Sequence, residues 1–346
     1  MVSLGDVAKA AGVSKSSACY VLRNQAGPSK ATREKVMKAA KKLGYVPDAN
    51  MLSFMSKVRD AKEKDLLPIA WLDTNWERDS WHKYKFFLPY LEGAKARALQ
   101  LGYRIEEIWA GEPGLTMKRV SDILYQRGIE GVVVTHPAKH FRLKWDYLAA
   151  VSLEGHLLAP RLHRVLADRP FNILLALKMV KRMGYRRIGI CVDETFSHFS
   201  NHGGMAVINQ FLATMPKMDR VAPLFIAWHR VENARLVVED RVVAWMRDQR
   251  PEVIVGNNGC LLDWARHAGY RVPEDLGIVH TAIDDDVADW AGIYSNRRKI
   301  GAVAAEQVIS LTRNREFGIP SIPISLVIRG NWRHGNTLLN LKAKAG

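Results

Sequence analysis

The sequence has little cysteine and no long apolar run. Its 346 residues include only Cys19, Cys191 and Cys260, which are far apart and form no CxxC pair. Their odd number and wide spacing argue against a disulfide framework or a zinc site and favour a reducing compartment. No apolar run approaches the ~20 residues that cross a bilayer, and the first residues show no signal segment. We therefore expect a cytoplasmic protein with no membrane partner.

The short motifs of common enzyme classes are also missing. There is no P-loop, no G-x-G-x-x-G after a strand, no HExxH and no G-x-S-x-G. The 11 histidines show no arrangement typical of a catalytic triad. The acidic triplet 284–286 has no histidine at ligand spacing, so solvated charge is expected there rather than a metal. We predict a protein that is not an enzyme and holds no metal or cofactor.

Positive charge is concentrated near the N-terminus. The formal net charge is +16, and residues 1–64 contribute half of it, with 13 lysines and arginines against five acids. Concentrated positive charge is typical of a protein that binds a polyanion. A basic surface that serves only solubility is the alternative.

Three short helical patterns fill residues 3–44. The first ends at Gly12, where a tight turn favours a residue free to adopt a positive φ. Ser14 is placed to cap the second helix, and Ser29 the third, which ends at Gly44. Apolar residues at helical spacing form the inward faces: Leu4, Val7, Ala8, Ala11, Val13, Ala18, Val21, Leu22, Val36, Ala39, Ala40 and Leu43. This pattern predicts a helix-turn-helix domain.

From residue 67 the pattern alternates between strands and helices. Strand-like runs cover 67–72, 103–109, 131–135, 149–153, 187–192, 221–228, 253–256 and 276–281. Helical runs cover 90–101, 118–127, 171–183, 233–247 and 300–312. Such alternation predicts parallel sheets covered by helices on both faces. Because about 270 residues exceed what one sheet comfortably holds, we expect two doubly wound lobes with a ligand cleft between them.

The stretches DVAKAAGVS (6–14) and KATREKVMKAAKKLGYVP (30–47) stand out in the N-terminal part of the chain. They resemble the DNA-binding domain of the lactose-repressor-type (LacI/GalR) family of bacterial transcription regulators. Weaker matches follow in order along the core: LEGAKARALQLGY (91–103), RGIEGVVV (127–134), KMVKRMGYRRIGI (178–190), YRVPEDLGIV (270–279) and LVIRGNW (326–332).

The resemblance implies a homodimer on double-stranded operator DNA, located in the bacterial cytoplasm and at the nucleoid when bound. It implies a helix-turn-helix domain (1–47), a hinge helix and linker (48–66), and a core like periplasmic sugar-binding proteins (67–336). The chain crosses between the core lobes three times, so lobe 1 takes about 67–164 and 296–322 and lobe 2 about 165–295 and 323–336. Residues 337–346 remain as a basic tail. A small effector, here expected to be a carbohydrate, controls the affinity for the operator.

In the family, residues on the outward face of the second helix reach DNA. Lys15 could donate a hydrogen bond to the O6 or N7 atom of guanine, and Ser16 could bond to a donor or an acceptor of either base in a pair. Tyr20 stands where arginine is common, and it could pack on a thymine methyl, donate to phosphate, or pack against the third helix. Cys19 replaces a serine, which weakens one backbone contact. The predicted DNA-binding residues are Ser14, Lys15, Ser16, Ser17, Tyr20, Arg23, Lys30, Arg33, Asn50 and Phe54.

Phe54 matches the hinge residue that wedges between bases in the family, although it could instead pack the two hinge helices together. Asn50 stands where the family is small and apolar.

For the effector, the loop 73–87 supplies polar and aromatic residues, and we expect Phe86 and Phe87 to lie in the core or a dimer interface. The family's second-lobe arginine is missing, and Asn201 and His202 stand in its place. Asp168 matches a strand-end aspartate of the family. The predicted effector-binding residues are Asp73, Asn75, Trp76, Trp81, Asn201, His202, Asn257 and Asp284.

Three functions follow from these patterns. The first is an effector-responsive DNA-binding regulator that acts as a repressor. The second, motivated by the missing arginine, is a regulator without an effector response. The third is an α/β enzyme acting on sugars or nucleotides with a DNA-binding module, against which the missing motifs argue.

Overall fold

The computed structural model describes residues 4–22, 28–43, 66–74, 77–135, 142–154, 159–193, 202–226, 234–284 and 289–342, and of Leu4, Ser16, Cys19, Lys30 and residues 234–236 it describes the backbone alone. The chain divides into two compact units, residues 1–65 and 66–346. This division falls where the charged linker was predicted. The predicted hinge (48–58) and the linker lie outside the described residues.

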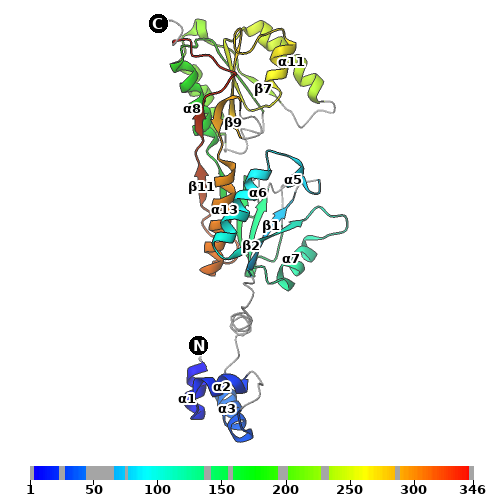
Figure 1. Ribbon diagram of the computed structural model, residues 1–346, viewed down its shortest axis with the longest axis vertical. Helices are drawn as coiled ribbons and strands as arrows, with labels where there is room; N and C mark the ends of the chain where they lie inside the picture. Colours follow the sequence, from blue (N-terminus) through cyan, green and yellow to red (C-terminus); the bar gives the residue numbers. More distant parts are fainter. Residues whose placement is uncertain are drawn as a thin grey trace. The chain divides into compact units, whose positions relative to one another are not determined.

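The first unit holds the three predicted helices, α1 (Leu4–Ala11), α2 (Lys15–Leu22) and α3 (Lys30–Leu43) (Figure 1). Gly12 has a φ of +64°, and the Val13 N–H closes the end of α1 by donating to the Ala8 carbonyl at 3.0 Å. The Ser14 and Ser29 hydroxyls accept from the N–H groups of Ser17 and Thr32. The predicted caps are therefore confirmed.

The core of this unit is small and formed by the predicted apolar faces. Seven fully buried residues pack together, and four partly buried ones surround them. They are Val7, Ala8, Ala18, Val21, Val36, Ala39 and Ala40, with Ala11, Val13, Leu22 and Leu43 around them. All belong to the set expected from the helical spacing, in which only the Leu4 side chain is not described.

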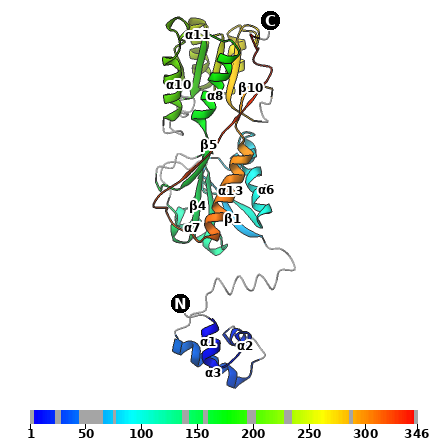
Figure 2. The ribbon, with the colours of Figure 1, turned by 90° about the vertical axis from the view of Figure 1, so that its left-hand side faces the viewer.

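The second unit contains two six-stranded sheets, as the alternation of strands and helices predicted. The first has the order β11-β5-β4-β3-β1-β2, and all its pairs are parallel. Its strands are β1 (Leu67–Asp73), β2 (Tyr103–Trp109), β3 (Gly131–Thr135), β4 (Ala149–Leu153), β5 (His163–Ala167) and β11 (Ser325–Ile328). Helices α6 (Leu88–Gln100) and α13 (Arg297–Arg313) cover one face, and α7 (Met117–Gln126) covers the other (Figures 1 and 2).

The second sheet has the order β12-β10-β9-β8-β6-β7, with β12 antiparallel to β10. Its strands are β6 (Ile188–Asp193), β7 (Leu224–Ile226), β8 (Val253–Gly256), β9 (Gly277–Ile283), β10 (Ala291–Tyr294) and β12 (Asn331–Arg333). Helices α8 (Arg169–Arg182) and α10 (Gly203–Ala213) pack on one face. On the other lie α11 (Ala234–Gln249) and α12 (Leu261–His267). The strand predicted over 221–228 starts only at Leu224, because Pro223 has no N–H for a ladder, and residues 227–228 lie outside the described residues.

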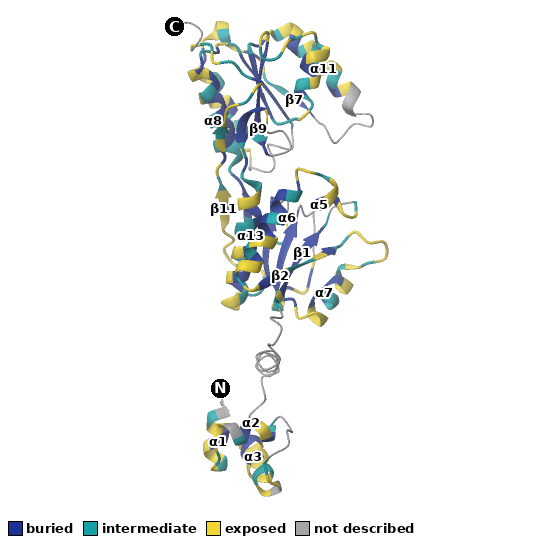
Figure 3. Ribbon diagram, in the orientation of Figure 1, coloured by how far each residue is buried: buried dark blue, intermediate teal, exposed yellow. Residues whose placement is uncertain are grey.

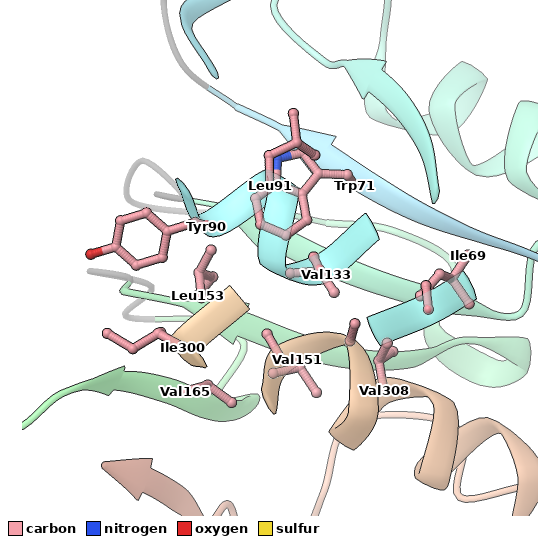
Figure 4. Packing of buried hydrophobic residues seen from close by; sticks show 14 of the residues in the cluster. Ile69, Trp71, Tyr90, Leu91, Val133, Val151, Leu153, Val165, Ile300 and Val308 are labelled. Carbon is pink, nitrogen blue, oxygen red and sulfur yellow. The ribbon is translucent and has the colours of Figure 1, made fainter. Parts of the chain in front are cut away.

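The inner strands of both sheets are largely buried, the edge strands β2, β11 and β12 are partly exposed, and the outer helix faces are exposed (Figure 3). In the first lobe, α6 and α13 press their apolar faces onto β1, β3, β4 and β5 (Figure 4). The two helices approach so closely that a Cβ on Gly301 would lie 1.8 Å from the Tyr90 carbonyl oxygen. This contact fixes α13, and with it Arg297 at its first position, against α6.

The chain crosses between the lobes three times, as the family resemblance implied. The crossings lie between β5 and α8, between β10 and α13, and between β11 and β12. Two predicted lobe boundaries are wrong. Residues 165–167 belong to β5, and 325–328 form β11, so both segments lie in the first sheet rather than in lobe 2. Strand β11 pairs in parallel with β5 and forms the edge of the first sheet before the chain crosses to β12.

Residues 337–342 are part of the second lobe rather than a loose tail, which corrects the prediction for 337–346. The Thr337 hydroxyl is buried and donates to the Ile278 carbonyl at 2.7 Å. Leu338 and Leu341 pack on the apolar cluster below α8, and the Tyr185 hydroxyl donates to the Leu339 carbonyl. The leucines of this segment anchor it to the lobe despite its lysines, because burying apolar side chains stabilises the fold, whereas the charges can stay in solvent.

Candidate functional site

Helix α2 presents a short outward face with few polar contacts of its own. Lys15 and Tyr20 are exposed, and the Tyr20 side chain keeps 48% of its surface accessible. Ser14 and Ser17 are hydrogen-bonded to each other. The Ser14 hydroxyl donates to Ser17 Oγ at 2.9 Å, and it caps the helix by accepting from the Ser17 N–H. Lys15 and Tyr20 are therefore the described side chains of α2 that are most available to a partner.

Helix α3 adds positive charge to the same unit. Lys35, Lys38, Lys41 and Lys42 are exposed, and Arg33 is half-buried. Lysines spread along a helix in this way neutralise phosphates and set the salt dependence of binding without reading sequence. Ser16 and Lys30 lie on the described helices without described side chains, and Arg23, Asn50 and Phe54 lie outside the described residues.

In the core, the carboxyl ends of the parallel strands carry three of the predicted effector residues, Asp73, Asn257 and Asp284. Asp73 ends β1, is buried, and accepts a hydrogen bond from the Ser80 hydroxyl at 3.1 Å. The Thr74 hydroxyl donates to the Thr135 carbonyl at the end of β3, which ties the two strand ends together. Asn75, Trp76 and Asn201 lie outside the described residues.

The aromatic residues that follow β1 are arranged differently from the prediction. Trp81, expected at the effector, is only 2% exposed, and its ring meets Trp71 edge-on at 4.9 Å in the apolar core. Trp81 is therefore a packing residue. Phe87 lies in the core, one of the two places predicted for it, whereas Phe86 keeps 42% of its surface exposed in the single chain, so that a place in a dimer interface stays a prediction. The Arg297 guanidinium lies 6.0 Å from the Phe86 ring centre.

A buried ion pair joins the end of β4 to the start of α8. Glu154 follows β4 and is 1% exposed, and its Oε2 lies 2.5 Å from Arg169 Nη2. Its Oε1 accepts from the Ala167 N–H at 2.8 Å and from the Tyr90 hydroxyl at 3.4 Å. Burial raises the pKa of Tyr90 well above its usual value, and the Glu154 carboxylate adds to this shift, so the phenol stays protonated. Figure 4 shows the Tyr90 hydroxyl pointing away from the apolar cluster.

A second pair joins the end of β9 to the start of α13. Asp284 follows β9 and is 1% exposed, and its Oδ2 lies 3.7 Å from Arg297 Nε. The Arg297 Nη2 donates to the Ala282 carbonyl at 2.9 Å. Arg297 begins a helix of the first lobe and contacts two residues of the second, so it sits where the lobes meet.

Asn257, another predicted effector residue, holds together the strand ends of the second lobe. Its Oδ1 accepts from the Asp193 N–H at the end of β6 at 2.9 Å. The buried His280 imidazole bonds to the Asn257 backbone and accepts from the Ala282 N–H at 3.2 Å. Burial and the nearby Arg297 lower the pKa of His280 to about 4, so the imidazole is neutral at pH 7.

The other residues that sequence reasoning singled out have structural roles. Asp168 caps α8 by accepting from the Phe171 N–H at 3.1 Å, and it pairs with Arg329 at 3.3 Å across two lobe crossings. His202, with a φ of +63°, precedes α10. In the part of the chain that the structure describes, no group of three acidic, histidine or cysteine side chains is arranged to hold a metal. In that part, no helix is long and apolar enough to cross a membrane.

Sequence reasoning missed Glu154, Arg169 and Arg297. Each lies directly at a strand end or at a lobe crossing, which is where ligands bind in open α/β sheets. A search for charged residues at the first position after each crossing would have found both arginines.

The first unit matches a known family directly. The sequence model of "Bacterial regulatory proteins, lacI family" matches residues 3–48, which are the three helices and their caps. The helix-turn-helix domain therefore belongs to the LacI family of bacterial regulatory proteins.

Curated relatives extend the match into the core. The transcriptional repressor PurR of Vibrio vulnificus is 22% identical over 91% of this chain and 93% of its own length. The regulator MalR of Streptococcus pneumoniae is 28% identical over 38% of each chain, so that match spans well under half of the relative. The sucrose operon repressor of Vibrio alginolyticus is 48% identical over 48 residues, 14% of this chain and 51% of its own.

Solved structures agree with the fold. The regulator CelR, solved as a cellobiose complex, matches 97% of this chain and all of its own with a TM-score of 0.58 at 17% identity. The Lac repressor dimer bound to operator and the anti-inducer ONPF matches 97% of this chain and 98% of its own, with a TM-score of 0.57 at 16% identity. A LacI-family regulator of Enterococcus faecium with bound ribose matches 79% of this chain and 99% of its own, with a TM-score of 0.55 at 13% identity. These likenesses confirm two lobes that follow a helix-turn-helix domain.

Proposed function

We propose that this LacI-family protein is a homodimeric repressor of the bacterial cytoplasm and nucleoid, and that it binds double-stranded operator DNA through α2. The observation that carries the proposal is the match of residues 3–48 to the family, folded here with Lys15 and Tyr20 exposed on the second helix of a helix-turn-helix. The second helix of this motif is the one that enters the major groove. The net charge of +8 on residues 1–64 supports contact with phosphates.

We propose further that a small carbohydrate binds at the carboxyl ends of the two sheets and controls the affinity for DNA. Asp73, Asn257 and Asp284 support this site because planar amide and carboxylate groups bind hydroxyls from fixed directions. Phe86 supplies an exposed ring beside Arg297, and an aromatic face suits the apolar C–H face of a sugar. Two regulators of the same fold were solved in complex with cellobiose and with ribose.

A regulator without an effector response remains the second candidate. It is supported by the ion pairs of Arg169 with Glu154 and of Arg297 with Asp284, because both guanidinium groups already have a carboxylate partner within the chain. The two candidates differ in one measurement, which is whether any sugar changes the affinity for the operator. No specific observation favours an enzyme.

Selection of DNA from a random duplex library by the full-length protein tests the proposal. We expect enrichment of a two-fold symmetric site whose half-sites lie one helical turn apart, because two copies of α2 must reach the same face of the duplex. A library that shows no enrichment after several rounds would refute a sequence-specific regulator. Enrichment that vanishes in the Tyr20→Ala and Lys15→Ala double variant, while general DNA affinity persists, would assign the reading to α2.

A further inference from the structure

One end of the second lobe, opposite the proposed effector site, concentrates positive charge. Helices α8, α10 and α11 lead into the parallel strands β6, β7 and β8, so their last turns lie together at the amino ends of these strands. The charged segments there, which we call the basic surface, are 181–187, 217–220, 247–252 and 342. They contain nine lysines and arginines against three acids. The neighbouring segments 266–275 and 289 add two arginines and three acids, so they lower the excess only from +6 to +5.

Direct contacts join the segments of the basic surface. The Arg187 guanidinium donates to the Met218 carbonyl at 3.1 Å and to the Arg250 carbonyl at 3.2 Å. The Lys342 N–H donates to the Met183 carbonyl at 3.3 Å. Helices α8 and α10 pack side by side on one apolar cluster (Figure 2). The cations of separate segments therefore belong to one surface.

The cations of the basic surface differ in their pairing from those of the first lobe. Six lysines and arginines of the first lobe form ion pairs with carboxylates, namely Lys83, Lys95, Arg97, Arg104, Arg127 and Lys144. Within the described residues, none of the nine cations of the basic surface forms such a pair; the ion pairs of the second lobe that lie nearest to it are His267–Glu239 and Arg271–Asp275. The positive charge of the basic surface is therefore available to an anionic partner.

Two of the nine cations have a structural role at helix ends. The Arg187 and Arg220 guanidinium groups donate to the carbonyls of Gln249 and Ala213, the last residues of α11 and α10, where a cation complements the helix dipole. Other cations of the surface do no such work. The side chains of Arg182, Arg186, Lys217 and Lys342 are exposed, and within the described residues none of them forms a hydrogen bond or an ion pair. Helix capping thus explains only part of this charge.

An array of exposed cations without aromatic rings suits the phosphates of a DNA duplex. Single-stranded nucleic acid is held by bases that stack on exposed aromatic side chains, but Tyr185 and Phe211, which lie beside these cations, are buried. A duplex carries one phosphate charge per about 1.7 Å of its axis, so it presents several phosphates to such a surface at once. Contacts of this kind hold DNA without reading its sequence.

We propose that the basic surface is a second DNA-binding surface, which holds a further duplex by its phosphates regardless of sequence. One protein then bridges two DNA segments, one at α2 and one at the core. The family model matches residues 3–48 alone, so the inference goes beyond the function proposed for the helix-turn-helix.

Energy transfer between two labelled duplexes tests this bridging on the full-length protein. Donor- and acceptor-labelled copies of one scrambled duplex are mixed with the protein at about 0.05 M salt, where phosphate contacts are strong. The triple variant Arg182→Gln, Arg186→Gln and Lys217→Gln removes three exposed cations from the basic surface. We expect the protein concentration at half-maximal transfer to rise about tenfold or more in this variant, because each lost phosphate contact weakens the binding.

A matched control removes the same charge elsewhere. Lys118→Gln, Arg119→Gln and Arg142→Gln neutralise three exposed cations of the first lobe, and this variant should bridge the duplexes as the wild-type protein does. Both variants should keep the melting temperature of the wild-type protein, because the six changes lie on the surface.

Each other result has a definite meaning. Wild-type protein that shows no transfer, a basic-surface variant that bridges as well as the wild type, or a control that loses bridging equally overturns the second DNA-binding surface. Poly-L-glutamate that binds the wild-type protein but not the basic-surface variant, in the absence of bridging, would assign the surface to an acidic protein and overturn the DNA assignment. Failure to select any operator refutes the proposed sequence-specific regulator and leaves the bridging result unchanged, since the duplexes used here are scrambled.

Discussion

Replacing Gly301 with alanine should push apart the two helices that carry the first-lobe side of the effector site. The added Cβ would lie 1.8 Å from the Tyr90 carbonyl oxygen, so α13 and α6 must separate by about 1.5 Å to reach an ordinary carbon–oxygen contact. Overpacking of this kind costs about 3 kcal/mol at the upper end of its usual range. Alanine recovers about 1 kcal/mol through its higher helix propensity. We expect a net loss of about 2 kcal/mol, or roughly 5 °C in melting temperature.

The assay is thermal and urea unfolding of the full-length protein, followed by tryptophan fluorescence. Gly259→Ala is the matched control, since a Cβ there would meet nothing within 4 Å, and its effect should stay within about 0.5 kcal/mol. Because Arg297 begins the same helix and Tyr90 reaches Glu154, Gly301→Ala should also weaken the binding of any effector. Equal stability of the Gly301→Ala variant and the wild-type protein would refute the close packing of α6 against α13.

Four further predictions concern separate parts of the chain. Lys15→Ala should relax base preference at one operator position at a cost of about 1–3 kcal/mol; an equal loss of affinity for all DNA sequences would make Lys15 a phosphate contact only. Trp81→Ala should destabilise the core by about 3–5 kcal/mol in urea unfolding, and a neutral effect would restore Trp81 as an effector candidate. The pKa of His280 is lowered to about 4 by burial, so the unfolded chain binds its proton more readily, and stability should fall by about 2 kcal/mol from pH 7 to pH 5, less so in a His280→Gln variant. Deleting residues 1–64 should abolish DNA binding and leave a folded, dimeric core in sedimentation and circular dichroism; an unfolded product contradicts the division into two units.

Much of the fold could be predicted because its strands are buried on both faces. The runs 131–135 and 253–256 are uninterrupted, mostly β-branched and bounded by polar or turn residues, so their limits are those of β3 and β8. The helix-turn-helix could be predicted equally well, because Gly12, Ser14 and Ser29 mark where its helices end and begin. Local signals of this kind need no knowledge of distant residues.

The remainder depends on contacts between distant segments. The strand β11 belongs to the first sheet because it pairs with β5, some 160 residues earlier, and nothing in residues 325–328 themselves reveals that partner. Trp81 and Phe86 lie five residues apart in one aromatic loop, and only the packing of α6 decides which is buried. The pairs Glu154–Arg169 and Asp284–Arg297 arise where strand ends meet lobe crossings, which sequence spacing does not encode.

The most direct test of the account is the ratio of affinities for the selected operator and for a scrambled duplex of the same composition, measured with and without an uncharged sugar. Fluorescence anisotropy of the full-length protein at 0.15 M salt gives both values. We expect a ratio on the order of 10³ or more and a fall in that ratio when an effective sugar is added. Equal affinity for the two duplexes would contradict the central claim that this protein is a sequence-specific regulator.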